Sequence, residues 1–335
     1  MPVPVTVAEA RYKDVHSIVL EDDVLQITVV PGCGAKIASL INRRTGHECL
    51  YQLPGAIFRK VAYGAPYNRG EAAGWDEMFP TIGECYCDAE PWAGVKMPDH
   101  GEVWSVPWQV EPIQSGIRVS VHGVRFPYRL TRTITMDRPG VLLLRYRAEN
   151  LCACDLPAMW AAHPLFNVTA GTRIILPESA RDIFSTTACP ALGEYGARYT
   201  FPVAATARGT RWDMSRIHEN AGVHYFNYSF TDALQEGFAI LHDPATRETV
   251  ALAWPVGQVP YLNVWVSEGA WEGQYNMSLQ PCTAPLDRWD VARQWGKLPV
   301  IPAHGSLEWE LRVTAGLWDD PRRVEPDGTI VSSQR

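Results

Sequence analysis

The stretch IRVSVHGVRFPYRLTRTITMDRPGVLLLRYRAEN, residues 117–150, indicates the fold class most clearly. Its parts 117–126, 129–136 and 141–150 either alternate apolar and polar residues or are rich in β-branched residues, as half-buried strands are. The tetrapeptide DRPG at 137–140 is a turn signal between the last two parts. We therefore expect consecutive strands joined by turns in this part of the chain.

Strand-like segments of the same kind occur on both sides of this stretch, with turn signals such as PGCG at 31–34 between them. No long segment keeps a 3.6-residue apolar period, and only 284–297 could form a helix, of about three turns. Many short strands with almost no helix are typical of an all-β protein built from packed antiparallel sheets. The other strand-like segments are 24–30, 103–110, 172–177, 237–243, 249–255, 261–267, 275–281 and 306–316.

The composition is that of a soluble globular protein. The chain has 335 residues, of which 46% are hydrophobic and 20% charged, so it can bury a large core without disulfides or metals. A net charge of -7 argues against nucleic-acid binding, which needs clustered Lys and Arg. We expect one domain over residues 1–318 and a polar tail over 319–335 that lies on the surface or frays.

Signals for secretion or membrane insertion are not evident in the sequence. The N-terminal stretch MPVPVTVAEARYKD does not have the pattern of a signal peptide, and no apolar run approaches the ~20 residues of a membrane span. The eight cysteines are scattered, and they include the pairs Cys85/Cys87 and Cys152/Cys154. Buried thiols are the simplest interpretation; a Cys₄ zinc site is the alternative, although structural zinc usually uses C-x₂₋₄-C spacing. We expect a reduced, cytoplasmic protein.

Two histidines stand out as candidate acid/base groups. His100 lies in PDHGEVW (98–104), and His163 lies in AAHPLFNV (161–168) at the expected end of a strand. A histidine beside Gly or Pro is by itself more often a turn or cap residue. The acid-rich and aromatic segment GWDEMFPT (74–81) precedes both of them.

Taken together and in this order, these segments resemble the aldose 1-epimerase (galactose mutarotase-like) superfamily. The matching features are GAKIASLINRRTGHECL (34–50), WDEMFPT, DHGE, HPLF and the later PYLNVW and LQP, which together span about residues 20–315. The resemblance implies a large antiparallel β-sandwich with few short helices, whose concave face holds a sugar. It also implies an isomerase of carbohydrate metabolism that needs no cofactor.

The resemblance also implies residue roles. In the family, one histidine is the acid, a second supports it, and a glutamate is the base; here His163 takes the acid position and His100 the supporting position. The glutamate position falls on Gln280, which departs from the family pattern. An amide can hydrogen-bond but cannot accept a proton as a carboxylate does. Losing the base would cost about 10²- to 10⁴-fold in rate unless another group replaces it.

Three explanations of Gln280 remain open at this point. Another carboxylate could be the base; the candidates are Asp76, Glu77, Glu102 and Glu268. The protein could instead run a different reaction on a sugar, such as a lyase or isomerase reaction, with a histidine as the base. Or it could bind a sugar without catalysis, as a sensor or a non-catalytic subunit.

The remaining site residues are expected to contact the sugar. Arg69 resembles the family arginine that binds substrate hydroxyls, Arg59 is a second candidate, and Trp75 and Trp265 could stack on a pyranose. A metal site formed by His100, Glu102 and His163 is the alternative, but we expect no metal. The partner is a small-molecule sugar, with no nucleic acid or membrane, and the protein is a monomer or homodimer. The full substrate-binding set is Arg69, Arg59, Trp75, Asp76, Glu77, Glu102 and Trp265.

Overall fold

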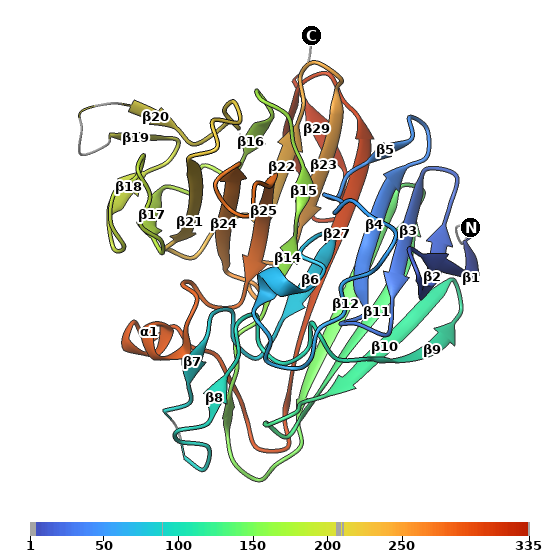
Figure 1. The fold of residues 1–335 in the computed structure, drawn as a ribbon, viewed down its shortest axis with the longest axis vertical. Helices are drawn as coiled ribbons and strands as arrows, with labels where there is room; N and C mark the ends of the chain where they lie inside the picture. The colour runs from blue at the N-terminus through green and yellow to red at the C-terminus, as the bar shows by residue number, and fades with distance from the viewer. Residues whose placement is uncertain (1–4, 89, 206–208, 210, 334–335) are drawn as a thin grey trace.

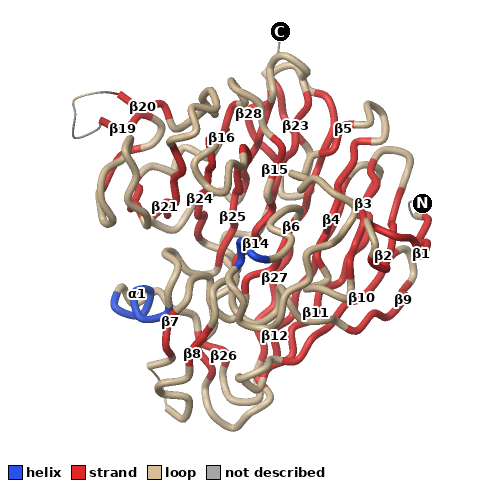
Figure 2. The backbone as a smooth tube through the Cα atoms, viewed as in Figure 1, coloured by secondary structure: helices blue, strands red, loops and turns tan. Residues whose placement is uncertain are grey.

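The computed structural model describes residues 5–88, 90–205, 209 and 211–333. Its architecture is all-β: two large antiparallel sheets stack face to face, as expected for a β-sandwich (Figure 1). Helix among the described residues is limited to a 3-10 turn, η1 (Tyr67–Arg69), and α1 (Trp289–Gln294) (Figure 2). The all-β prediction is confirmed.

The larger sheet, here called the site sheet, has 13 strands. Its short central strands β6 and β14 lie between β4 on one side and β25 on the other (Figure 1). The path through the sheet is β1 (Thr6–Tyr12), β2 (Val15–Glu21), β3 (Leu25–Val30), β4 (Lys36–Asn42), β6 (Trp75–Met78), β14 (Ala161–Pro164), β25 (Tyr275–Cys282), β24 (Tyr261–Glu268), β21 (His224–Phe230), β17 (Asp182–Ser185) and β18 (Arg198–Thr200), with β5 (His47–Glu48) beside β4 and β15 (Phe166–Asn167) beside β25.

The smaller sheet, here called the back sheet, has eight strands, and the stretch 117–150 supplies three of them. Alternate residues of these strands face the site sheet, which the burial pattern of β11 shows most clearly. The order is β16 (Arg173–Ile175), β22 (Phe238–His242), β23 (Glu248–Ala253), β27 (Ser306–Leu317), β12 (Val141–Asn150), β11 (Tyr128–Arg138), β10 (Gly116–His122) and β9 (Gln109–Ile113).

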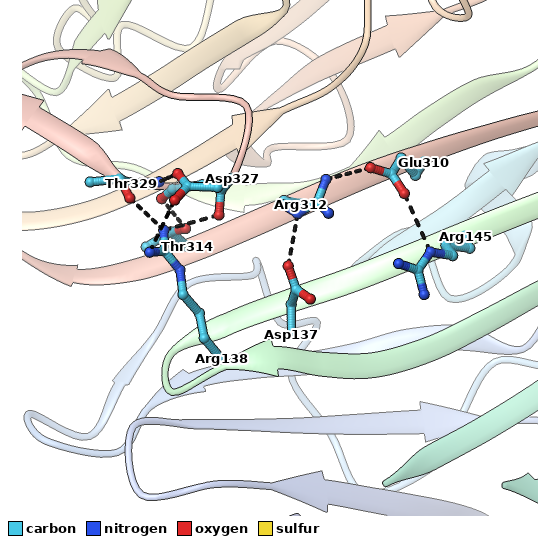
Figure 3. Close-up of polar contacts among 9 residues, drawn as sticks. Asp137, Arg138, Arg145, Glu310, Arg312, Thr314, Asp327 and Thr329 are labelled. Atoms are coloured by element: carbon cyan, nitrogen blue, oxygen red, sulfur yellow. Dashed lines mark hydrogen bonds and ion pairs between the residues drawn. The ribbon is translucent and has the colours of Figure 1, made fainter. Parts of the chain in front are cut away.

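The main hydrophobic core lies between the two sheets. The outer face of the back sheet instead carries partly exposed ion pairs, for example Arg312 with Asp137 and with Glu310 (Figure 3). Four two-stranded ribbons complete the fold: β7 (Cys85–Tyr86) with β8 (Lys96–Met97), β13 (Leu156–Pro157) with β26 (Val300–Ile301), β19 (Val203–Ala205) with β20 (Arg211–Asp213), and β28 (Pro321–Val324) with β29 (Ile330–Ser332).

Two local expectations need correction, and a third is narrowed. The expected strand 103–110 is mostly a turn, because Val103 and Trp104 are buried by loop packing, and only its end enters β9. The expected helix over 284–297 is reduced to α1, since Leu286 adopts a positive φ of 71° that a helix cannot contain. Of the two alternatives expected for the tail, 321–332 lies on the surface and does not fray: its two strands pair, and Val324 and Ile330 pack on the back sheet.

The cysteines do not form one cluster. Cys85 and Cys87 are buried as expected, whereas Cys152 is half-buried and Cys154 is exposed. Among the described residues, no helix is long and apolar enough to cross a membrane.

Candidate active site

A cavity of about 240 Å³ lies on the outer face of the site sheet, over the central strands and their loops. Three aromatic side chains, Tyr67, Trp265 and Trp271, contribute to its wall. The polar and charged residues that line it are Asn68, Asp99, His100, His163, Asn227, Gln280 and Asp287. An aromatic wall with a few converging polar groups is the usual construction of a small-molecule site.

β14 and β6 place His163 in the floor of this cavity. His163 pairs across the two strands with Asp76, and paired residues of an antiparallel ladder point to the same face of the sheet. His163 is only 5% exposed, and its Nδ1 lies 3.3 Å from the hydroxyl oxygen of Tyr67. Tyr67 comes from the 3-10 turn that covers this part of the sheet.

A left-handed turn presents His100 to the same cavity. The φ angles of His100 and Gly101 are +62° and +72°, and a β-carbon at Gly101 would lie 2.2 Å from the carbonyl oxygen of Phe79. Only glycine fits at that position. A positive φ at a histidine costs of order 1 kcal/mol or more, and strain of this kind is concentrated at functional sites. The HG pair in DHGE is therefore needed to shape the backbone as well as to supply the imidazole.

The two imidazoles lie next to each other in the cavity, edge to face. Their ring centroids are 4.8 Å apart with planes at 89°, and the His100 ring stacks on Tyr67 at 4.0 Å. Burial lowers the pKa of His163 well below 6.5, and the positive charges of His100 and Lys36 add to this effect. Nδ1 of His100 lies 3.1 Å from Oδ1 of Asp99, and although burial opposes it, this contact lowers the pKa of Asp99. One imidazole is thus held neutral while the other has an ionised carboxylate beside it.

Alternation along β24 and β25 brings Trp265 and Gln280 to the cavity. Asn263 pairs with Gln280 and Trp265 pairs with Ser278, so these side chains all point to the outer face. Gln280 is 3% exposed and lines the cavity where the sequence resemblance places a glutamate. The departure seen in the sequence is therefore located inside the site.

Asp287 is a cavity carboxylate that the sequence reasoning missed. It was hidden in the segment expected to be a helix, but its position next to Leu286, where the chain turns, places it beside the cavity. Asn227 donates a hydrogen bond to its Oδ2 at 2.9 Å. Burial, aided by the charge of Asp99, raises its pKa to about 6, against the opposing effects of Thr186, His100 and Asn227.

Comparison with known proteins agrees with this architecture. Residues 16–182 match the family model described as aldose 1-epimerase. Over this segment, about half of its length, the chain is similar to the aldose 1-epimerase family. A comparison with curated protein sequences finds no match.

Solved structures of galactose mutarotase-like proteins share the fold of this chain at low identity. A galactose mutarotase-like protein from Clostridium acetobutylicum has a TM-score of 0.66 at 12% identity, covering 95% of this chain and 99% of that one. A galactose mutarotase related enzyme from Lactobacillus acidophilus has a TM-score of 0.65 at 12% identity, with coverages of 92% and 100%. A galactose mutarotase-like protein from Lactobacillus casei has a TM-score of 0.61 at 17% identity, with coverages of 90% and 100%.

Not every residue that the family resemblance suggested lines the cavity. Arg59 and Arg69 are exposed and outside the lining. Trp75 and Glu77 point into the core between the sheets, because they alternate with Asp76 along β6. Asp76 faces the cavity side but lies behind Tyr67, whose hydroxyl donates to its Oδ2 at 3.0 Å.

The other carboxylates proposed as a substitute base are also turned away from the cavity. The carboxylate of Glu102 accepts hydrogen bonds from the Tyr63 hydroxyl and from the backbone N–H groups of 124 and 125. Glu268 accepts from the backbone N–H of His218 and lies 3.0 Å from its Nδ1, outside the cavity. In the described part of the chain, no group of three or more His, Cys, Asp or Glu side chains is placed to hold a metal ion. His100, Glu102 and His163 are thus not assembled as a ligand set.

Proposed function

We propose that this protein interconverts the anomers of a free aldose by acid–base catalysis in the cavity around His100 and His163. The observation that carries the proposal is the pair of imidazoles 4.8 Å apart, with the carboxylate of Asp287 lining the same cavity. Mutarotation needs a proton donor and a proton acceptor within reach of one sugar ring, and no cofactor.

The reaction balances with groups of this kind. A base removes the proton of the anomeric hydroxyl, the carbonyl at C1 forms, and the bond from C1 to the ring oxygen breaks while an acid protonates that oxygen. Rotation about the C1–C2 bond and the reverse transfers close the ring as the other anomer. Each well-placed acid or base contributes about 10²- to 10⁴-fold in rate.

Asp287 is the carboxylate best placed to act as the base. Gln280 cannot accept a proton, and Asp76, Glu77, Glu102 and Glu268 are all outside the cavity lining. With its pKa raised to about 6, Asp287 is largely ionised at pH 7 and close to the pKa that suits a general base there.

The cavity also has the size and surface for a single sugar ring. Its volume of about 240 Å³ is below the roughly 300–1,000 Å³ of sites for drug-sized ligands. The aromatic faces of Trp265 and Trp271 suit the apolar face of a pyranose, and Asn227 and Gln280 offer amide groups to hydroxyls.

Anomer-exchange NMR on equilibrated aldoses tests the proposal. The panel is glucose, galactose, arabinose, rhamnose and a uronic acid, with wild-type protein compared with the spontaneous rate. We expect acceleration by the wild type and a loss of about 10²- to 10⁴-fold in Asp287→Asn. Glu268→Gln is the matched carboxylate control outside the cavity and should keep the wild-type rate. Absence of acceleration with every sugar would refute the proposal.

Sugar binding without catalysis is the second candidate, and Gln280 in the cavity favours it. A binding protein should show a dissociation constant for one of these sugars but no anomer exchange, and its His163→Ala variant should change affinity only. An enzyme should lose rate more than affinity. Gain of exchange in Gln280→Glu, from a wild type that has none, would identify the binding protein.

A further inference from the structure

A buried polar chain lies directly under the cavity and ends on His163. It consists of Lys36, Asp76 and Tyr67: the Lys36 ammonium contacts Oδ2 of Asp76, and the Tyr67 hydroxyl lies 3.0 Å from the same oxygen. The Tyr67 oxygen is also 3.3 Å from Nδ1 of His163. All four residues are at most 5% exposed, so water does not compete for these contacts.

The direction of each hydrogen bond in this chain follows from what each group can donate. Asp76 is paired with the Lys36 ammonium, and an ionised carboxylate can only accept. The Tyr67 hydroxyl keeps its proton, because burial and the nearby Asp76 charge raise its pKa well above 10. It has a single proton and the carboxylate is the stronger acceptor, so that proton goes to Asp76. The Tyr67 oxygen is then left to accept a hydrogen bond from Nδ1 of His163.

We infer that the buried polar chain holds His163 as its neutral Nδ1–H tautomer, with an unprotonated Nε2 that accepts a hydrogen bond from the sugar. This inference rests on the proposed function for its substrate, but the tautomer itself is a property of the free protein. Lys36, Asp76 and Tyr67 are positioning residues, since they act through His163; Tyr67 also contributes its ring to the cavity wall.

The electrostatics of the site are consistent with a neutral His163. Burial lowers its pKa well below 6.5, and the charges of His100 and Lys36 act in the same direction. A neutral imidazole has one N–H, and the Tyr67 oxygen takes it. Nε2 has no hydrogen bond to any described residue, and the ring lines the cavity. His163 therefore has no proton to give to a sugar oxygen.

The proton donor of the reaction is then His100, which reverses the roles expected from the sequence. Its ring lines the cavity, and its Nδ1 lies 3.1 Å from Oδ1 of Asp99. His100 gives its proton to the ring oxygen as the bond to C1 breaks, Asp287 takes the anomeric proton, and both transfers reverse on ring closure. His163 orients a sugar hydroxyl through Nε2.

Nitrogen NMR of the free protein tests the tautomer directly. Long-range ¹H–¹⁵N correlation spectra of ¹⁵N-histidine-labelled protein distinguish protonated from unprotonated ring nitrogens, and the spectrum of His163→Ala assigns the His163 signals. We expect a protonated Nδ1 and an unprotonated Nε2 between pH 6 and 8. A protonated Nε2, or a charged imidazolium, would overturn the inference whatever the activity.

A pair of tyrosine variants tests whether the buried polar chain is the cause. Tyr67→Phe keeps the ring but removes the acceptor oxygen, so the Nε2–H tautomer should become populated. Tyr63→Phe removes another tyrosine hydroxyl, which donates to Glu102 away from the cavity, and should leave the His163 signals unchanged. A Tyr67→Phe protein that keeps the wild-type tautomer would show that the chain does not hold it.

Two glutamine variants test the roles in catalysis. The amide oxygen of glutamine can still accept a hydrogen bond but its amide group cannot give up a proton. We expect His163→Gln to lose at most about tenfold in anomer exchange and His100→Gln to lose about 10²- to 10⁴-fold. The opposite order would make His163 the donor. If the tautomer is as inferred but no protein accelerates exchange, the proposed function fails and the tautomer assignment stands.

Discussion

Two neighbouring residues of β6, Asp76 and Glu77, show how one strand serves both the site and the core. Both carboxylates are fully buried and both are paired with a cation. Asp76 points to the cavity side, where it meets Lys36 and the Tyr67 hydroxyl. Glu77 points between the sheets, where Arg132 of β11 donates to its Oε1 at 2.6 Å.

The two carboxylates differ in how completely their oxygens are satisfied. Both oxygens of Glu77 accept hydrogen bonds, because the Tyr146 hydroxyl shares Oε1 with the arginine and Trp160 donates to Oε2 at 2.7 Å. Oδ1 of Asp76 has no partner among the described residues. Glu77, whose two oxygens are both bonded, joins the two sheets. Asp76, with one unbonded oxygen, belongs to the buried polar chain that orients His163. Burial and an ion pair alone do not separate a structural acid from a functional one.

The largest effect expected from this comparison is the loss of stability in Glu77→Gln. One oxygen becomes an amide group that faces existing donors, and Arg132 loses its counter-charge in the core, so we expect a cost of about 3–5 kcal/mol. Asp76→Asn is the matched change one residue away. Lys36 loses its counter-charge, but the new amide can occupy the unpartnered Oδ1 position and faces no existing donor, so we expect a smaller cost of about 2–3 kcal/mol. Urea denaturation of both variants measures the difference. Equal costs would show that the bonding of the two carboxylates does not distinguish them.

A second and smaller effect concerns Asp287, the cavity carboxylate whose pKa is raised from 3.8 to about 6. Because the folded state binds this proton more tightly than the unfolded state, its contribution to stability is present below pH 3.8 and is lost as the pH rises through about 6. Ionised Asp287 should therefore cost the folded protein on the order of 1–3 kcal/mol at pH 7.5.

Asp287→Asn isolates this contribution. The variant should be more stable than wild type at pH 7.5, and the difference should shrink towards pH 4, where the wild-type carboxyl is protonated. Denaturation curves of both proteins at the two pH values measure it. A difference that does not change with pH would mean that the Asp287 carboxyl titrates alike in the folded and unfolded states.

The smallest effect is expected on the outer face of the back sheet. Arg145 has a 58% exposed side chain and pairs with Glu310 at 3.3 Å (Figure 3). Exposed pairs are screened by water and salt, so Arg145→Ala should change the free energy of unfolding by about 0.5 kcal/mol or less. The same denaturation assay in low and high salt measures it. A cost near that of Glu77→Gln would mean that exposure does not set the strength of these pairs.

Much of the fold could be predicted from local sequence. The segments 129–136, 141–150 and 261–267 fall within strands, because a half-buried strand shows its period in its own residues. The strand predicted for 103–110 was wrong, because apolar residues such as Val103 and Trp104 are also buried when a loop packs against the core. The hairpin within 321–332 has too few apolar residues to be predicted from its sequence. It is held by packing of Val324 and Ile330 against β22 and β23 of the back sheet.

The site could be predicted only in part. The quoted motifs led to His100, His163, Gln280 and Trp265, which the fold brings to one cavity. The period of two in WDEM could have placed Trp75 and Glu77 opposite Asp76, which would have removed both from the substrate-binding set. Nothing local marked Asp287, because its segment resembles a helix.

The sequence by itself determined the strand pattern, the position of the turns and the identity of the two histidines. These depend on neighbouring residues, since strand period and turn chemistry act over a few positions. Only the tertiary structure decided that Asp287 shares the cavity with them and which nitrogen of His163 has the proton. Those properties depend on Asp287, Lys36, Asp76 and Tyr67, which are distant from His163 in the chain and reach it only when the sheet forms.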